Sequence, residues 1–298
     1  MSVLECRIAI RLEAGSSIEE ILAEREDPRW MVIENTDLGR AWLTGFFEDR
    51  EAAEAAWRVL APLVKSQLED AEPVLTRVAD QDWKESYKAH FRAWHCGRIH
   101  WVPVWERDAY ELPEGDVAVW LDPGMAFGTG NHETTRLCLE RLTRISSELE
   151  AAGRPPSSVG MIDAGCGSGI LAISAAALGF DPILAFDLDP EAVRVSRENA
   201  ALNGLADRVV FEQADLRAGL HGRKARVVMA NIQADVLMAG RDLLLGALDR
   251  GGELVLSGIL GCELHEVRDC FDAFGPGFVS DSRSMEEWSD LLITRRDG

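Results

Sequence analysis

The segment Asp163–Gly169, with the sequence DAGCGSG, follows the apolar run VGMI and precedes the helical run ILAISAAAL. Glycines at alternate positions allow a tight turn and a close approach to a ligand, and amides at the start of the following helix point toward that ligand. A dinucleotide fingerprint requires G-x-G-x-x-G, but here the third glycine, Gly169, comes one place early. The pattern predicts a nucleotide-binding loop, with Asp163, Gly165 and Gly167 near the ligand.

A second acid stands at the end of the next predicted strand, PILAFD. Asp187 follows Gly165 by 22 residues, where a carboxylate can accept hydrogen bonds from both hydroxyls of a ribose. Asp189 is the competing residue, but it precedes a proline and is better placed to cap the next helix. We therefore expect Asp187 to hold the ribose, and we expect Asp215, after the third strand, to lie near the base.

The fourth predicted strand, RVVMAN, ends with Asn231. Enzymes that methylate amino groups of nucleic acids commonly have the sequence N-P-P-Y at the end of this strand, and the ring of its tyrosine stacks on the base. This chain has Asn-Ile-Gln-Ala, which disfavours a flipped base as substrate. The Asn231 amide can still accept a hydrogen bond from an amine and orient its lone pair. The alternative role for Asn231 is to cap the helix ADVLMAG.

A third glycine-rich stretch, DPGMAFGTGNHETT, covers residues 122–135. No lysine follows its glycines, so it is not a phosphate-binding loop. We expect a mobile lid in which Phe127 covers the ligand, while Thr134 and Thr135 open a helix whose amino terminus binds a carboxylate. A plain turn with an Asx or threonine helix cap is the alternative, and it leaves the aromatic residue between glycines unexplained.

The elements around these motifs predict an α/β fold with a separate amino-terminal part. From Val117 onward, apolar strand runs alternate with helical runs, which indicates a parallel sheet covered on both faces, and residues 275–296 lack a helix and predict an antiparallel hairpin. Residues 1–79 predict the strand and helix order of a small ferredoxin-like α+β domain. Residues 80–115 predict a linking helix and strand, and residues 116–298 form the large domain.

Charge and composition exclude several classes of protein. Acidic residues outnumber basic ones by 51 to 31, for a net charge of -20, which opposes direct nucleic-acid readout and favours a basic partner. No apolar run is long enough to span a membrane, so we expect a cytoplasmic protein with reduced cysteines. The cluster His90, His95, Cys96 and His100 lacks zinc-site spacing, so no metal is expected.

Taken together, LDPGMAFGTGNHETT, IDAGCGSGILAI, FDLDPEAVRVSRENAALNG, ANI and LSGIL resemble the ribosomal protein L11 methyltransferase family. The glycine loop alone is similar to motif I of class I methyltransferases that depend on S-adenosyl-L-methionine. The resemblance implies a Rossmann-like catalytic domain, S-adenosyl-L-methionine as cofactor, and methyl transfer to amino groups of ribosomal protein L11. It also implies that the amino-terminal ferredoxin-like domain recognises that protein.

The resemblance also implies a set of site residues. The family's cofactor contacts fall on Thr135, Gly165, Asp187 and Asn231, with Phe127 and His132 nearby. The chain departs from the family at three positions that flank the expected site of transfer, namely Asn131, Glu133 and Gln233.

Three other functions remain open from the sequence. The first is a lysine methyltransferase of a different protein, and the second is a non-catalytic assembly protein that binds S-adenosyl-L-methionine. A nicotinamide dehydrogenase is the third; the glycine spacing and the lack of a recognisable hydride-transfer pair oppose it.

Overall fold

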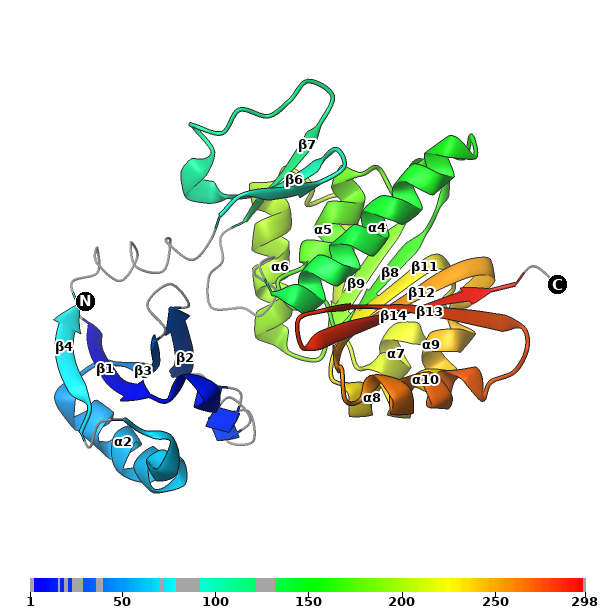
Figure 1. Ribbon diagram of the computed structural model, residues 1–298. Coiled ribbons are helices and arrows are strands. Elements are labelled where there is room, and N and C mark those ends of the chain that lie inside the picture. Colours follow the sequence, from blue (N-terminus) through cyan, green and yellow to red (C-terminus); the bar gives the residue numbers. More distant parts are fainter. Residues whose placement is uncertain are drawn as a thin grey trace. The chain divides into compact units, whose positions relative to one another are not determined.

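The computed structural model describes residues 3–15, 17–18, 21–22, 29–35, 40–69, 72–78, 92–121 and 132–296 (Figure 1). The chain divides into two compact units, Met1–His90 and Phe91–Gly298. Among the described helices, none has the length and the apolar character that crossing a membrane requires.

The smaller unit contains a four-stranded antiparallel sheet in the order β2-β3-β1-β4. Its elements are β1 (Val3–Ile10), β2 (Trp30–Asn35), β3 (Arg40–Phe47), α2 (Arg50–Val64) and β4 (Val74–Val78). Alternation along β1 buries Cys6, Ile8 and Ile10 against helix α2, because successive side chains of a strand point to opposite faces. The predicted strands are confirmed. The ferredoxin-like assignment stays a prediction, since much of the expected first helix lies outside the described residues.

Helix α2 differs from expectation at Pro62, where the sequence suggests a kink or a break. The helix continues through Pro62 to Val64 and passes into a 3-10 helix, η2 (Lys65–Gln67). A proline removes its own backbone hydrogen bond and crowds the carbonyl group four residues earlier, but Pro62 is two residues from the end of α2, so only the last turn is affected. The other 3-10 helices are η1 (Leu12–Ala14), η3 (Val104–Glu106) and η4 (Pro156–Ser158).

The larger unit contains a seven-stranded sheet in the order β10-β9-β8-β11-β12-β14-β13. Its strands are β8 (Met161–Ala164), β9 (Ile183–Asp187), β10 (Val209–Gln213), β11 (Ala225–Asn231), β12 (Leu248–Leu260), β13 (Phe278–Met285) and β14 (Trp288–Arg295). Strands β8 to β12 pair in parallel, while β13 and β14 form an antiparallel hairpin beside β12. The predicted α/β fold with a mostly parallel sheet and a closing hairpin is confirmed.

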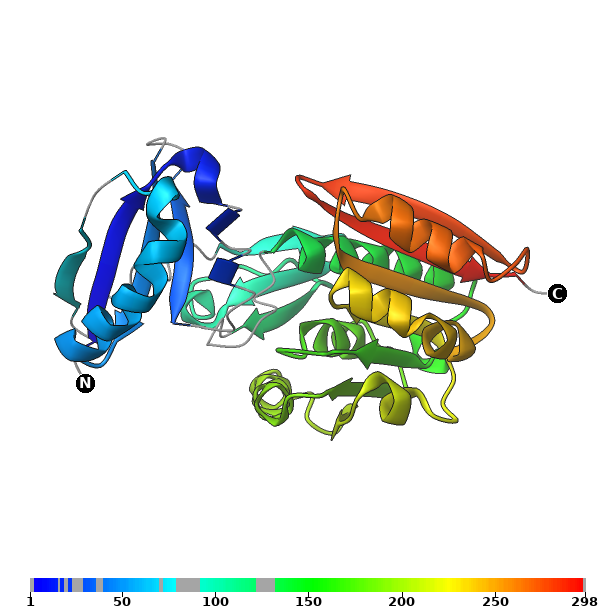
Figure 2. The same cartoon turned by 90° about the horizontal axis from the view of Figure 1, so that it is seen from below.

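Helices cover both faces of this sheet (Figures 1 and 2). One face packs against α4 (Glu133–Ala151), α5 (Ile170–Ala177) and α6 (Pro190–Leu202), and the other against α7 (Leu216–Leu220), α8 (Ala234–Ala239), α9 (Arg241–Gly246) and α10 (Leu264–Asp272). Strand β11 shows why its sequence is apolar throughout. Val227 and Met229 join the core on one face, while Val228 and Ala230 join the core on the other.

Two details of the larger unit correct the sequence prediction. The run VAVWL forms β7 (Val117–Leu121), which pairs with β6 (Ile99–Pro103) in a separate sheet that also includes β5 (Trp94–Cys96). It is apolar because Val119 and Leu121 pack into the core around α4 and α5. The predicted single helix ADVLMAGRDLLLGAL is divided into α8 and α9 at Gly240, where an added Cβ would lie 2.7 Å from a methyl carbon of Leu216.

Candidate functional site

The glycine loop connects β8 to α5 at the carboxyl edge of the parallel strands. Gly165, Gly167 and Gly169 all have positive φ angles, of 77°, 51° and 79°, which strongly favours glycine. A Cβ on Gly165 would lie 2.4 Å from Cγ2 of Ile232, so this backbone is packed directly against the residue after Asn231. The third glycine has another role: a Cβ on Gly169 would lie 2.7 Å from Cβ of Ser196, so Gly169 allows α5 to approach α6.

Asp187 ends β9 beside this loop. One oxygen of its carboxylate accepts a hydrogen bond from the Gly167 amide at 2.9 Å, and the other accepts from the Asp189 amide at 3.0 Å. These two contacts fix the carboxylate at the edge of the loop, where the sequence predicts it. Asp189 caps α6 through the amide of Glu191, at 2.8 Å, as the sequence also predicts.

A cavity of about 400 Å³ opens at the ends of β8, β9, β10 and β11. Its lining comes from the glycine loop, from the ends of β9 and β10, and from α7, α8 and α9: Gly165, Phe186, Asp187, Leu188, Ala214, Asp215, Leu216, Arg217, Ile232, Val236, Ala239, Gly240 and Leu243. Leu188, beside Asp187, is 70% exposed. A mostly apolar slot edged by the carboxylates of Asp187 and Asp215 fits a nucleoside, whose ring is apolar on its faces and whose ribose hydroxyls are donors. Asp215 lines this cavity, as the sequence predicts, and also caps α7.

Asn231 and Thr135 meet beside the glycine loop. The Asn231 side-chain amide donates to the Thr135 hydroxyl at 3.4 Å, which connects the end of β11 to the first turn of α4. The Asn231 carbonyl oxygen, Oδ1, is buried and accepts no hydrogen bond from any residue that the structure describes. A buried acceptor without a donor is costly. A ligand that presents an N–H group would satisfy it.

Helix α4 begins differently from the sequence prediction. It starts at Glu133, and His132 is its amino-terminal cap, with Nδ1 accepting from the Thr134 amide at 3.3 Å. Thr134 and Thr135 therefore lie buried inside the first turn and do not cap it. Burial lowers the pKa of His132, which favours the neutral ring that can accept this bond. Phe127 and Asn131 lie outside the described residues.

Asp163 lies beneath the loop, away from the cavity. It has no exposed surface, and its carboxylate accepts from the Ala172 amide of α5 at 3.1 Å. Burial raises the pKa of Asp163 to about 7. These contacts make Asp163 a support for the loop. Asp163 is expected near the ligand from the sequence, but it is not among the residues that line the cavity.

Gly258 and Ile232 form a close contact that the sequence motifs do not predict. Gly258 has φ 82°, and a Cβ there would lie 2.5 Å from the backbone oxygen of Ile232. Ile232 is thus enclosed between Gly258 on one side and Gly165 on the other. The only signal in the sequence is the glycine in the strand run LVLSGIL, since glycine inside a strand often marks a close backbone approach.

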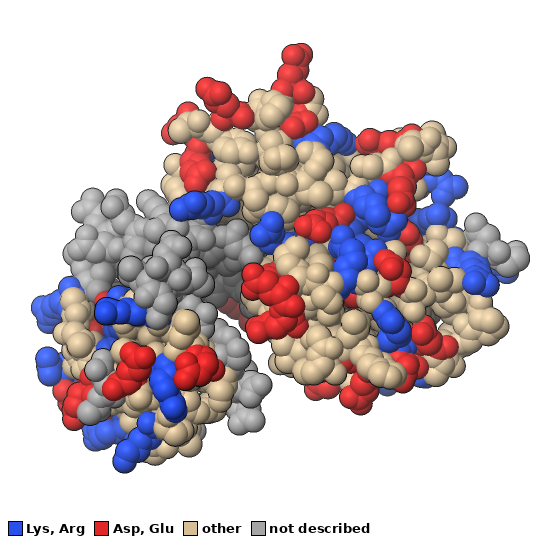
Figure 3. Space-filling view, viewed as in Figure 1, with Lys and Arg blue, Asp and Glu red and all other residues tan. Residues whose placement is uncertain are grey.

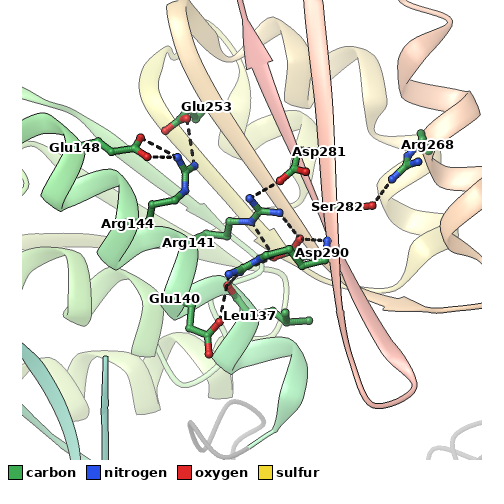
Figure 4. A network of polar contacts seen from close by, with 11 residues as sticks. Leu137, Glu140, Arg141, Arg144, Glu148, Glu253, Arg268, Asp281, Ser282 and Asp290 are labelled. Atoms are coloured by element: carbon green, nitrogen blue, oxygen red, sulfur yellow. Dashed lines mark hydrogen bonds and ion pairs between the residues drawn. The ribbon is translucent and has the colours of Figure 1, made fainter. Parts of the chain in front are cut away.

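A buried ionic network holds α4 against the carboxyl-terminal hairpin (Figure 4). Arg141 of α4 forms two hydrogen bonds with Asp290 of β14, at 2.9 and 2.8 Å, and a third with Asp281 of β13 at 2.8 Å. Arg283 reaches the same Asp290 at 2.7 Å and also donates to the Leu137 carbonyl of α4. Because Thr135 lies on this helix, the network fixes the first turn that meets Asn231.

Two of the histidines considered for a metal site, His95 and His100, have other contacts, and His90 lies outside the described residues. His100 is buried between the Tyr110 hydroxyl, at 2.7 Å, and the Asp116 carboxylate, at 2.8 Å, and the ring of His95 stacks on it. Within the described ranges, no group of three or more histidine, cysteine, aspartate or glutamate side chains is arranged to hold a metal ion.

Comparisons with known proteins agree with this geometry. A ribosomal protein L11 methyltransferase from Citrifermentans bemidjiense is 47% identical over 191 residues, which cover 64% of this chain and 60% of that protein. One from Pseudomonas aeruginosa strain LESB58 is 39% identical over 290 residues and 92% of each chain. The crystal structure of a ribosomal protein L11 methylase from Lactobacillus delbrueckii subsp. bulgaricus superposes with a TM-score of 0.60 and 31% identity, over 70% of this chain and all of that one.

The family model described as Ribosomal protein L11 methyltransferase (PrmA) matches residues 7–296, which is nearly the whole chain. This match agrees with the glycine loop, the acid at the end of β9 and the asparagine at the end of β11. The chain therefore belongs to the ribosomal protein L11 methyltransferase (PrmA) family.

Proposed function

We propose that this protein transfers a methyl group from S-adenosyl-L-methionine to amino groups of ribosomal protein L11, either lysine side chains or the amino-terminal amine. The observation that carries the proposal is the buried, unsatisfied Oδ1 of Asn231, which lies beside the loop that would hold the donor.

The cavity residues suit an adenosyl group. Asp187 would accept from the ribose hydroxyls, and Leu188 would contact the adenine ring. The backbone at Gly165, which lines the cavity, would lie against the donor, while Ile232 fills the space that a side chain at this position would take. Bound S-adenosyl-L-methionine supplies a methyl group already activated by the positive sulfur. The protein's contribution is then orientation, which supplies on the order of 7 to 11 kcal/mol in favourable cases.

The acceptor amine must reach the site without its proton. A lysine ammonium has a pKa of about 10.4, and transfer to a dry site lowers that pKa, so the proton can pass to water as the amine enters. Asn231 Oδ1 would accept a hydrogen bond from the neutral amine and so direct the nitrogen lone pair. Thr135 fixes the Asn231 amide from the other side through its hydroxyl.

The surface near this site suits a basic protein. Three exposed carboxylates, of Asp235, Glu286 and Glu287, lie at the carboxyl edge of the sheet, in α8 and in the turn between β13 and β14. The whole chain is acidic, with a net charge of -20. Negative charge near the opening would attract a positively charged partner and increase its rate of association. The relatives' names support ribosomal protein L11 as that partner.

The domain assignment follows from the same proposal. Residues 1–79 would recognise the protein substrate, residues 80–115 would link the two parts, and residues 116–298 would carry the methyl transfer. A cytoplasmic location is proposed with it, since ribosomal proteins are made there.

The experiment is methyl transfer from labelled donor to purified ribosomal protein L11, with wild-type enzyme and the Asn231→Ala variant. We expect the variant still to bind S-adenosylhomocysteine while its kcat falls by about two orders of magnitude or more. Normal turnover by the variant would show that Asn231 does not orient the acceptor amine. A labelled lysate protein other than L11, with L11 itself unmodified, would favour the second candidate, a lysine methyltransferase of a different substrate.

A further inference from the structure

Ser257 lies beside Asn231 in the large sheet and forms a hydrogen bond with helix α4. Asn231 ends β11, and Ser257 is its partner in the parallel register of β12. The Ser257 side chain has no exposed surface, and its hydroxyl donates to the backbone carbonyl of Thr134 at 3.1 Å. Thr135, the next residue of α4, accepts from the Asn231 amide. Two neighbouring strands therefore hold consecutive residues of the same helical turn.

The geometry of the sheet explains why these two side chains reach the same helix. Side chains at matching positions of adjacent strands point to the same face of a sheet. Met229 of β11 and Val255 of β12 each lie two residues earlier, and both join the core that includes α4. Asn231 and Ser257 therefore continue toward α4, near the carboxyl ends of their strands.

Ser257 also belongs to a β-bulge. The register between β12 and β14 shifts after Leu256. Ser257 and Gly258 together lie opposite a single residue of β14, Asp290. The extra residue places Ile259 in the core on the face away from α4, which regular alternation from Ser257 would not do. Such bulges are common next to active sites, where they direct a side chain.

The bulge is held on two sides. Gly258 has φ 82°, and a Cβ there would lie 2.5 Å from the backbone oxygen of Ile232. On the other side, Asp290 accepts two hydrogen bonds from Arg141 of α4, at 2.9 and 2.8 Å (Figure 4). Ser257 is therefore fixed relative both to the end of β11 and to α4, which is what a residue that positions another one requires.

We propose that Ser257 is a positioning residue for methyl transfer. By holding the Thr134 carbonyl, it sets the place at which the Thr135 hydroxyl meets the Asn231 amide. The inference rests on the proposed function, in which Oδ1 of Asn231 accepts a hydrogen bond from the acceptor amine. Ser257 is not among the residues that line the cavity, so it acts through Thr135.

The contact that Ser257 maintains is sensitive to small movements. Nδ2 of Asn231 and the hydroxyl oxygen of Thr135 are 3.4 Å apart, beyond the usual range of about 2.7–3.2 Å for such a bond. Without the Ser257 hydroxyl, the Thr134 carbonyl loses a hydrogen bond, and a slight outward movement of the helical turn breaks the contact. The Asn231 amide can then rotate, so a smaller fraction of molecules presents Oδ1 to the amine.

The first measurement follows the side-chain amide of Asn231 by NMR in protein with isotopically labelled asparagine, of which the chain has five residues. The signal that disappears in Asn231→Ala identifies it. We expect Ser257→Ala to shift this signal in the same direction as Thr135→Val, whereas the matched control Ser289→Ala leaves it unchanged. Ser289 is an equally buried serine of β14 whose hydroxyl bonds to Ser284. An unmoved Asn231 signal in Ser257→Ala would overturn the proposal.

The second measurement is a double-variant cycle on methylation of ribosomal protein L11. We expect Ser257→Ala to lower kcat by about fivefold, with the KM for L11 and the affinity for S-adenosylhomocysteine within about twofold of wild type. Ser257 and Ser289 have no exposed surface, so neither variant alters the mixed acidic and basic surface of the larger unit (Figure 3). In the Thr135→Val or Asn231→Ala background, Ser257→Ala should change kcat by less than about twofold, since the contact through which it acts is already lost.

Three kinetic results would contradict this role: a wild-type kcat in Ser257→Ala, an equal loss in Ser289→Ala, or an undiminished loss in the Thr135→Val background. Normal turnover by Asn231→Ala would overturn the proposed role of Asn231 and this role with it. Slow turnover by Asn231→Ala with unchanged turnover by Ser257→Ala would overturn this role alone. The NMR measurement needs neither donor nor protein substrate, so it decides the structural step even if L11 is not methylated.

Discussion

The side-chain amide of Asn231 donates a hydrogen bond to the hydroxyl of Thr135 across 3.4 Å, between residues that are 96 positions apart in the chain. This contact leaves the carbonyl oxygen of Asn231 buried and without a described donor. It therefore determines which end of the amide is presented to a substrate. The sequence places both residues at the site, but only the structure shows that one orients the other.

Replacing Thr135 by valine removes this hydroxyl and keeps the side-chain volume. We expect kcat to fall by about tenfold, because the Asn231 amide loses the acceptor that fixes its orientation, and the free energy of unfolding to fall by about 1 kcal/mol. Steady-state methylation and urea unfolding measure the two effects. Thr143→Val is the matched control, since Thr143 is buried in the same helix and bonds to the Leu139 carbonyl. An equal loss of kcat in both variants would show a general effect on α4.

Replacing Gly165 by alanine places a methyl group 2.4 Å from Cγ2 of Ile232 at a backbone with φ 77°. We expect loss of S-adenosylhomocysteine binding by calorimetry, since the loop must move away from its packed position. Gly179→Ala is the control: its φ is 94°, but nothing lies within 4 Å of the added carbon, so it costs only the conformational strain of about 1–2 kcal/mol. Adding Ile232→Ala to Gly165→Ala should restore part of the binding. No recovery in that double variant would mean that the contact with Ile232 is not the cause.

Replacing Arg141 by methionine breaks the buried network between α4 and the hairpin. We expect the free energy of unfolding to fall by roughly 3 kcal/mol, because Asp290 has no exposed surface and keeps only Arg283 as a charged partner. Arg144→Met is the control on the same helix. Arg144 forms partly exposed pairs with Glu148 and Glu253, and losing them should cost less than about 1 kcal/mol. Similar costs for the two variants, measured by urea unfolding, would contradict a special role for the buried pair.

The buried Asp163 should make stability depend on pH. Burial raises its folded pKa to about 7, above the ordinary value of 3.8, so the folded state keeps a proton that the unfolded state releases. The stabilisation by protonated Asp163 is complete below the pKa of the unfolded state, and it is lost as the pH rises toward the pKa of the folded state. Between these two pKa values, the free energy of unfolding of wild type should fall by about 1.4 kcal/mol per pH unit relative to that of Asp163→Asn, whose side chain cannot ionise. Urea unfolding of both proteins at several pH values tests this, and a constant difference between them would refute the shifted pKa.

The sequence predicts the large sheet and most of the site because local signals specify them. Alternating and apolar runs predict the strands, and the positions of Gly165, Asp187 and Asn231 at strand ends follow from the parallel topology. The position of VAVWL in a separate sheet was not predictable, because an apolar strand at the centre of a sheet and one packed against two helices have the same sequence pattern. The cap at His132 and the enclosure of Ile232 by Gly258 depend on contacts between distant segments, which no local pattern encodes.

The central claim is that the cavity beside Gly165 and Asp187 holds an adenosyl donor next to Asn231. Calorimetric titration of S-adenosylhomocysteine into wild type and into Asp187→Ala tests this claim most directly. We predict stoichiometric binding by wild type and at least about tenfold weaker binding by the variant, because two ribose hydroxyls lose a charged acceptor. Absence of binding to wild type, or equal affinity in the two proteins, would contradict the claim.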